Sequence, residues 1–381
     1  MEEKLKLYLR SMVSNEGSDL HIKAGAYPRA RVHGVLRVLG EERFGIQEVE
    51  SLVKHITTKV TYQKLQKHGS ADFSYKPDDE SRFRVNAFNQ IDGLSIVFRV
   101  IPSQIPTIQG LKLPEVIEKF SDMPRGLVLV TGVTGSGKST TISALIGKIN
   151  RTYQKHIITL EDPIEFVHQN MKCLVNQRAL GSDFYDFKDA LPAALREDPD
   201  VILVGEMRDP ETIELAMHAA NTGHLVFSTL HTLDAKETIN RIVGSFAKEE
   251  QGRIRFSLAS VLSGIVSQRL IPAKNGGRVV AAEIMMQTSR IRELIAENRD
   301  FEILDAIEEG HDIYGSQSFD QHLLSMVDGR VITEEVALEH ASKPSDLKLK
   351  LEGVGRGGAK QAIKEIEGDT MDAFEFKVVE H

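Results

Sequence analysis

The spacing of apolar positions is strand-like in the first hundred residues of the chain. Two stretches, 29–39 and 83–101, alternate apolar and polar positions on either side of a turn signal, which is His-Gly in the first and Asp-Gly in the second. Period-two alternation around such a dipeptide is typical of an antiparallel β-hairpin. Together with short helical stretches, these hairpins predict a small α+β domain over residues 1–101.

Prolines cluster in the segment that follows, residues 102–124. They are Pro102, Pro106, Pro114 and Pro124. Proline fixes its own backbone torsion and donates no backbone hydrogen bond, so such a cluster is typical of a stiff connection. We expect residues 102–124 to link two domains rather than to form a core element.

From residue 125 onward, short apolar runs alternate with stretches of helical character, such as 140–150 and 211–223. The apolar runs are 126–132, 156–162, 201–206 and 225–231. This alternation predicts an α/β domain with a mostly parallel sheet and helices on both faces. Ligands of such sheets bind at the carboxyl ends of the strands. We assign 125–350 to this larger domain, with helices at its end, and 351–381 to a flexible tail.

Composition narrows the class of protein. The chain has 381 residues, of which 41% are hydrophobic and 27% charged, as in globular proteins, and its net charge is −8. A negative net charge argues against broad binding to nucleic acid or anionic membranes. The single cysteine, Cys173, excludes an internal disulfide and any multi-cysteine zinc module. The first ten residues lack the apolar core of a signal peptide, so we expect a cytoplasmic protein.

The strongest motif is GVTGSGKST at 132–140, which matches the phosphate loop G-x-x-x-x-G-K-[ST]. It follows an apolar run and opens a helical stretch, the context that the motif requires, so a chance match in a glycine-rich turn is the weaker alternative. Backbone N–H groups of this loop cradle phosphates, Lys138 reaches the terminal phosphates and Ser139 ligates Mg²⁺. The sequence therefore predicts ATP and Mg²⁺ as cofactors. The expected contacts are Thr134, Gly135, Ser136, Gly137, Lys138, Ser139 and Thr140.

The apolar run VILVG is followed directly by an acidic residue, Glu206. In phosphate-loop proteins a neighbouring strand commonly ends in an acidic residue that faces the Mg²⁺ site. We expect Glu206 to reach the metal through a water and to orient or activate the attacking water. The alternative is a structural ion pair with Arg208.

A second acidic strand end is Glu161-Asp162, just before Pro163. Adjacent side chains of a continuing strand point to opposite faces, so only one of the two should meet the site. We choose Glu161 as catalytic and assign Asp162 a role in a turn or helix cap.

A third strand end, at 225–232, offers donors that could sense the terminal phosphate. They are Ser228, Thr229 and His231, with His224 standing before the strand. Loss of the phosphate on hydrolysis removes an acceptor, which such donors can report. A structural histidine is the alternative for both His231 and His224.

Taken with GSDLHIKAG and SRFRVNAF upstream, these motifs resemble the secretion ATPase superfamily, specifically the PilT-type motors of type IV pilus retraction. The resemblance implies a PAS-like N-terminal domain, a RecA-like P-loop ATPase domain and a homohexamer at the cytoplasmic face of the inner membrane. The implied partners are a membrane platform protein and other pilus motor ATPases; no nucleic acid is expected. In the resemblance, the histidine box of the family corresponds to His224 and His231, and the acidic motifs of the family correspond to Glu161-Asp162 and Glu206.

The family also uses arginines of the N-terminal domain on the nucleotide, and Arg82, Arg84 and Arg99 match them. Arg82 and Arg84 lie two apart on one predicted strand and so share a face, while Arg99 lies on the returning strand. Clustered like charges repel unless an anion approaches, and a triphosphate held by the other domain or by a neighbouring subunit would supply one. A solvated basic face is the alternative.

Other functions stay open at this point. The stretch SRIRELIAE at 289–297 departs from the family's AIRNLIRE-like segment, although it keeps an apolar helix face, so an accessory motor of PilU type is a variant. A pilus-assembly or secretion ATPase is an alternative, weakened by the lack of a four-cysteine zinc insert. A nucleic-acid translocase is weakened by the negative charge and by an aromatic content of 6% without tryptophan. The last alternative function is a nucleotide-binding switch that hydrolyses little ATP.

Overall fold

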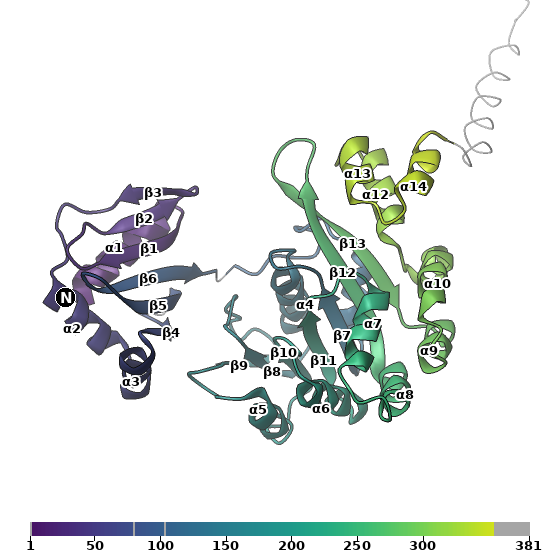
Figure 1. Cartoon of the computed structure of the whole chain (residues 1–381), viewed down its shortest axis with the longest axis horizontal. Helices are drawn as coiled ribbons and strands as arrows, with labels where there is room; N and C mark the ends of the chain where they lie inside the picture. Colours follow the sequence, from purple (N-terminus) through teal and green to yellow (C-terminus); the bar gives the residue numbers. More distant parts are fainter. Residues whose placement is uncertain (1, 79–80, 103, 354–381) are drawn as a thin grey trace, which may run out of the picture.

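The computed structural model describes residues 2–78, 81–102 and 104–353. It contains one antiparallel and one mostly parallel sheet, each with its own helices (Figure 1). The predicted tail lies outside the described residues from 354 onward. Within the described part, no helix is both long enough and apolar enough to span a bilayer.

The N-terminal domain is a six-stranded antiparallel sheet with three helices. Its strand order is β3-β2-β1-β6-β5-β4, and both predicted hairpins are confirmed as the pairs β2/β3 and β5/β6. One face of the sheet packs its apolar side chains against the helices. The strands are β1 (Gly17–Lys23), β2 (Arg29–Val32), β3 (Val35–Val38), β4 (Ser70–Tyr75), β5 (Arg82–Gln90) and β6 (Gly93–Ile101), and the helices are α1 (Glu2–Ser14), α2 (Ile46–Ile56) and α3 (Lys59–His68).

The larger domain is a seven-stranded sheet of order β13-β12-β7-β11-β10-β8-β9, parallel throughout except for β13. The four predicted strands, β7, β8, β10 and β11, are confirmed and lie together in its middle; the apolar pattern did not single out the other three. The strands are β7 (Gly126–Thr131), β8 (His156–Glu161), β9 (Leu174–Ala179), β10 (Val201–Val204), β11 (Leu225–Leu230), β12 (Leu262–Pro272) and β13 (Arg278–Met286). The helices that connect them are α4 (Lys138–Thr152), α5 (Phe187–Ala194), α6 (Pro210–Asn221), α7 (Ala235–Gly244) and α8 (Gln251–Val261).

The central strands are buried on both faces. On β7, Leu127 and Leu129 join the apolar cluster on one face of the sheet, whereas Val128 and Val130 join the cluster on the other. All six residues of β7 and all four of β10 are buried. Strands covered by helices on both sides need apolar residues at every position, which explains the unbroken apolar runs in the sequence.

The proline-rich segment is more than a linker, contrary to the prediction. Ile108, Leu113, Ile117 and Phe120 are buried in the core of the larger domain, where the last two lie in the 3-10 helix η1 (Glu115–Asp122). The Ser121 hydroxyl donates to the backbone carbonyl of Leu145 at 3.3 Å. Pro114 is the N-cap of η1, and the prolines of this segment do not prevent the apolar positions between them from packing.

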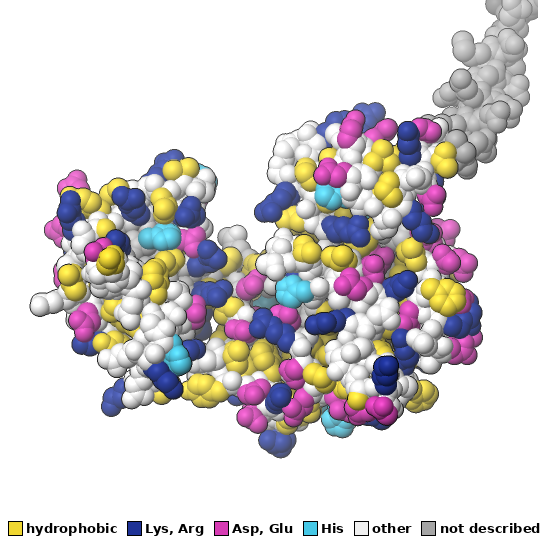
Figure 2. All heavy atoms as spheres, in the orientation of Figure 1, with side chains coloured by type: hydrophobic (Ala, Val, Ile, Leu, Met, Phe, Trp, Pro, Cys, Tyr) yellow, Lys and Arg dark blue, Asp and Glu magenta, His cyan; other side chains and the backbone are white. Residues whose placement is uncertain are grey.

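The C-terminal helices form a cluster beside the β12–β13 hairpin (Figure 1). Helix α9 buries Ile291, Leu294 and Ile295, which confirms the apolar face predicted for 289–297. Short elements complete the described chain: α9 (Ser289–Ala296), η2 (Asp300–Glu302), α10 (Ile303–Glu309), α11 (His311–Tyr314), α12 (Phe319–Asp328), α13 (Glu334–His340) and α14 (Pro344–Leu351). On the face shown in Figure 2, basic and acidic side chains are interspersed without a large field of one sign.

A core substitution tests whether the proline-rich segment belongs to the larger domain. Phe120→Ala removes a fully buried ring and should lower the free energy of unfolding of that domain by about 3 to 5 kcal/mol. Urea denaturation followed by circular dichroism measures the change. Lys119→Ala, on the exposed side of the same 3-10 turn, is the matched control and should change stability by less than about 0.5 kcal/mol. Equal effects of the two variants would contradict the assignment.

Candidate active site

The phosphate-loop motif forms the turn between β7 and α4. Gly132 has φ +141°, and a Cβ there would approach the backbone carbonyl of Gln268 to 2.4 Å, so only glycine fits. Gly137 is the N-cap of α4 with φ +95°, a left-handed conformation that also favours glycine. The turn therefore brings backbone N–H groups and the N-terminus of a helix to one place, as binding of phosphate requires.

A cavity of about 780 Å³ opens over this turn. That size suits a nucleotide-sized ligand. Of the predicted contacts, Thr134, Gly135, Gly137, Lys138, Ser139 and Thr140 line it. Ser136 is not among the lining residues; its hydroxyl is buried without a hydrogen-bond partner in the described part of the chain.

Lys138 points its ammonium group along the loop. Nζ donates to the backbone carbonyls of Gly132 at 2.8 Å and Val133 at 3.0 Å, and lies 3.5 Å from Nδ1 of His231. Burial lowers the pKa of Lys138, and the nearby carboxylates of Glu206 and Glu165 oppose that shift. A cation held mainly by neutral carbonyls is well suited to bind an anion that enters the cavity.

Glu206 is placed at the rim by its neighbours on both sides. The Gly205 N–H donates to the Leu160 carbonyl at the end of β8 at 2.7 Å, and the Thr229 hydroxyl of β11 donates to the Gly205 carbonyl at 2.7 Å. The stretch after β10 is thus clamped between the ends of the two adjacent strands. As a result, the side chain of Glu206 lines the same cavity as Lys138.

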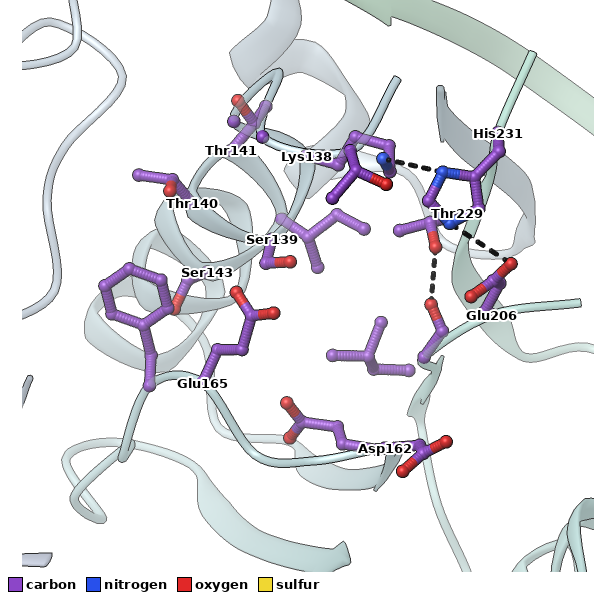
Figure 3. Close-up of a pocket in the computed structure, with 18 of the residues that line it drawn as sticks. Lys138, Ser139, Thr140, Thr141, Ser143, Asp162, Glu165, Glu206, Thr229 and His231 are labelled. Carbon is purple, nitrogen blue, oxygen red and sulfur yellow. Dashed lines mark hydrogen bonds and ion pairs between the residues drawn. The ribbon is translucent and has the colours of Figure 1, made fainter. Parts of the chain in front are cut away.

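His231 bridges the two charged groups (Figure 3). Its Nδ1 faces Lys138, and its Nε2 lies 3.3 Å from Oε1 of Glu206. The other oxygen of Glu206 is 2.8 Å from a guanidinium nitrogen of Arg208, so the ion pair considered as an alternative for Glu206 is present. Arg208 also lines the cavity and is 64% exposed, so the pair does not remove Glu206 from the site.

Both acidic residues at the end of β8 line the cavity, and the prediction that only one would do so is wrong. The reason is that β8 ends at Glu161, so Asp162 no longer follows strand alternation.

Burial raises the pKa of Glu161 to about 7, even though hydrogen bonds from Thr159, at 2.6 Å, and Gln177, at 3.2 Å, favour the ionised form.

Two of the predicted phosphate sensors lie away from this chain's cavity. His224 precedes β11 and bonds to the Ala219 carbonyl, at the end of the sheet opposite to the phosphate loop. A strand of six residues spans about 20 Å, so the ring cannot reach a phosphate in this site. Ser228 is fully buried within the sheet. Thr229 and His231, by contrast, line the cavity.

The three predicted arginines gather on the N-terminal sheet. Arg84 and Arg99 are directly opposite each other on β5 and β6, and Arg82 lies on the same face. Arg99 is paired with the buried carboxylate of Asp19 at 2.7 Å and Arg84 with Asp72 at 3.8 Å. None of the three is among the residues that line the cavity, as far as the described chain shows.

Some lining residues had no place in the prediction. Glu165 enters the cavity from the loop after β8, across from Glu206 and His231 in Figure 3. Leu111 comes from the proline-rich segment, and Arg278 and Val280 come from β13. The signal for Glu165 was its closeness to Glu161 in the sequence. The others lie far from any motif, and only the packing of the segment and of β13 beside the loop brings them in.

The residues present fit a nucleotide with its metal. Over the described residues, no cluster of three or more histidine, cysteine or acidic side chains could hold a metal ion by itself. Mg²⁺ is commonly held by one or two protein ligands together with substrate phosphates, and Ser139 and Glu206 are placed for such a shared site.

Fold and site together define a phosphate-loop protein with a mostly parallel α/β sheet of the RecA-like kind. Residues 1–338 match the family described as type II/IV secretion system protein. The chain belongs to this family, as the resemblance of its motifs had indicated.

Individual relatives are similar over nearly their whole length. The type IV pilus retraction ATPase PilT of Pseudomonas aeruginosa is 47% identical over 329 residues, which cover 86% of this chain and 95% of the relative. A twitching motility protein of Neisseria gonorrhoeae is 44% identical over a match that covers 91% of this chain and 92% of the relative. A crystal structure of the pilus retraction motor PilT with bound ADP matches with a TM-score of 0.82 and 42% identity, covering 91% of this chain and 98% of that one.

The raised pKa of Glu161 predicts a pH effect on stability. With a pKa of about 7 in the folded state against the usual 4.5, the folded protein binds more protons than the unfolded one between these pH values. The free energy of unfolding should therefore fall as pH rises from about 4.5 to about 7. Glu161→Gln cannot titrate and should gain stability relative to the wild type over that range.

Urea denaturation at pH 5, 6, 7 and 8 measures this difference. Glu283 has a similarly raised pKa, of about 7, and contributes to the slope of both proteins, so the difference between them isolates Glu161. Parallel curves for wild type and variant would show that Glu161 is ionised throughout.

Proposed function

We propose that this chain is a motor ATPase that couples ATP hydrolysis to retraction of type IV pili. The observation that carries the proposal is the alignment of Lys138, His231 and Glu206 along one cavity over the phosphate loop. The relatives named as retraction ATPase and as twitching motility protein, similar over most of both chains, supply the biological role.

The groups around the cavity have different roles in phosphoryl transfer. The loop backbone and Lys138 bind the β- and γ-phosphates of ATP, and the Ser139 hydroxyl would hold Mg²⁺. Mg²⁺, when bound, neutralises charge on the transferring group. Glu206, held from both sides by the ends of β8 and β11, accepts a hydrogen bond from the attacking water and orients it.

His231 is suited to report the state of the nucleotide. In the structure its ring lies between Lys138 and Glu206, within 3.5 Å of both. A γ-phosphate on Lys138 would add an acceptor beside the ring, and its loss would restore the arrangement seen here. Because His231 directly precedes the loop that leads to α7, a shift of the ring moves that loop.

Arginines of a neighbouring subunit complete the site in this proposal. Six copies form a ring, and Arg82, Arg84 and Arg99 of one copy approach the phosphates bound by the next. The support is their clustering on one sheet face, where Arg99 and Arg84 stay exposed although each pairs with a carboxylate of its own domain, and their separation from the cavity of their own chain. The ring works at the cytoplasmic face of the inner membrane, on a membrane platform protein and beside other pilus motor ATPases.

Retraction is favoured over the other motor roles. The accessory variant has support from PilU of Pseudomonas aeruginosa, which is 36% identical, below the 47% of PilT. For the assembly alternative, PilB of Thermus thermophilus is 34% identical, but the match covers only 30% of that relative. Stimulation of turnover by DNA would be the sign of a nucleic-acid translocase.

Two substitutions separate binding from hydrolysis. Lys138→Ala should abolish binding of a fluorescent ATP analogue, because the phosphates lose their cation. Glu206→Gln should still bind nucleotide but lose about 10²- to 10⁴-fold in kcat, the usual contribution of a positioned general base. Phosphate-release kinetics measure turnover. Glu211→Gln, an exposed glutamate in the first turn of α6, is the control and should keep wild-type kcat. Wild-type turnover in Glu206→Gln would assign the role of base to another residue, and negligible turnover in the wild type itself would leave the chain as a nucleotide-binding switch.

A deletion strain tests the biological role. Loss of a retraction motor should leave excess surface pili and no twitching, because assembly continues without withdrawal. Electron microscopy and a twitching-zone assay score the two features, and expression of the Glu206→Gln variant should fail to restore movement. Absence of pili would assign the chain to assembly, and normal twitching would assign it an accessory role.

A further inference from the structure

We propose that Gln177 is a positioning residue for Glu161, an inference that rests on the proposed ATPase function. Gln177 lies on β9, the edge strand of the large sheet, directly opposite Thr159 of β8. It belongs to none of the motifs that identify the site. Its amide makes three hydrogen bonds, all of them to the segment between Glu161 and His168.

The three bonds use both ends of the amide. Nε2 donates to Oε1 of Glu161 at 3.2 Å and to the Phe166 carbonyl at 2.9 Å, and Oε1 accepts from the His168 N–H at 2.7 Å. The partners fix the orientation of the amide, because two are acceptors and one is a donor. Among side chains of this length, only glutamine both donates and accepts in this way. A single side chain therefore ties the carboxylate to the loop behind it.

The loop held by Gln177 forms a wall of the cavity. Glu161, Phe166 and His168 all line it, as does Glu165 between them. His168 is buried, and burial lowers its pKa to about 4, so the ring is neutral at physiological pH. Its Nε2 lies 3.1 Å from the hydroxyl of Ser143, which belongs to the helix that begins at the phosphate loop.

A continuous set of bonds thus joins the end of β8 to helix α4. It runs from Glu161 through Gln177 to the backbone of residues 166–168, and from the His168 ring to Ser143. Catalytic groups must be held to a fraction of an ångström, and a shift of about 1 Å can cost about 100-fold in rate. Gln177 touches no reacting atom in this arrangement; it acts by fixing Glu161 and the loop that carries Glu165.

Three variants of the full-length protein test the role. Gln177→Leu removes all three bonds at similar size. Gln177→Glu keeps the acceptor for the His168 N–H but loses the donor to Glu161. Asn176→Ala is the matched control, because Asn176 is the preceding residue of the same strand and its amide contacts His156, away from the cavity. The readouts are kcat and KM for ATP, the pH dependence of kcat, and hydrogen exchange of residues 163–168 by mass spectrometry.

Gln177→Leu should lower kcat about 10- to 100-fold with KM within about threefold, since phosphate contacts are untouched. The acid limb of the pH profile should move to higher pH, because the Glu161 carboxylate loses a donor. Amide exchange of 163–168 should accelerate. Gln177→Glu should move the acid limb further still, through the like charge beside Glu161, while the His168 amide stays protected. Asn176→Ala should match the wild type in every readout.

Wild-type kcat, pH profile and exchange in Gln177→Leu would overturn the proposal and leave Gln177 as an ordinary edge-strand side chain. Should Gln177→Leu fail to fold, as judged by thermal melting, Gln177→Glu decides, and wild-type kinetics in that variant would overturn it. If the wild-type chain itself hydrolyses no ATP, the proposed function fails. Hydrogen exchange then still decides the positioning role, because faster exchange of 163–168 in the folded leucine variant supports it and unchanged exchange overturns it.

Discussion

The burial of parallel strands on both faces is the constraint on which the active site depends. Helices cover both sides of β7, β8, β10 and β11, so a charged side chain within these strands would be left without water. Charged groups can appear only where the strands end. Since parallel strands end at the same edge, the phosphate loop, Glu161, Glu206 and His231 collect there although they are spread over a hundred residues of sequence.

The same edge explains the electrostatics of the site. Lys138, His231, Glu206 and Arg208 follow one another along this edge, with separations of 3.5, 3.3 and 2.8 Å between successive groups. Burial raises the pKa of Glu161, and three hydrogen bonds to its carboxylate oppose that shift. Two glutamates at neighbouring strand ends thus differ in environment, which permits them different roles.

Support for the site comes from parts of the fold that carry no motif. The Thr229 hydroxyl holds the backbone before Glu206, and Gln177 holds Glu161 from the edge strand. The segment around Leu111 closes one side of the cavity because η1 packs against the sheet. Such residues contribute through one or two hydrogen bonds or contacts each, and no local pattern in the sequence distinguishes them from ordinary polar or apolar positions.

The sequence by itself determined what local chemistry can encode. Period-two alternation predicted both hairpins, unbroken apolar runs predicted the four central strands, and the glycines with Lys138 and Ser139 predicted the phosphate loop. Tertiary structure alone decided which side chains share the cavity. It ended β8 at Glu161, so that Asp162 faces the site, it placed His224 at the opposite end of the sheet, and it drew the proline-rich segment into the core. Motifs depend on torsions and spacing along the chain, whereas these placements depend on strand ends and packing between segments far apart in sequence.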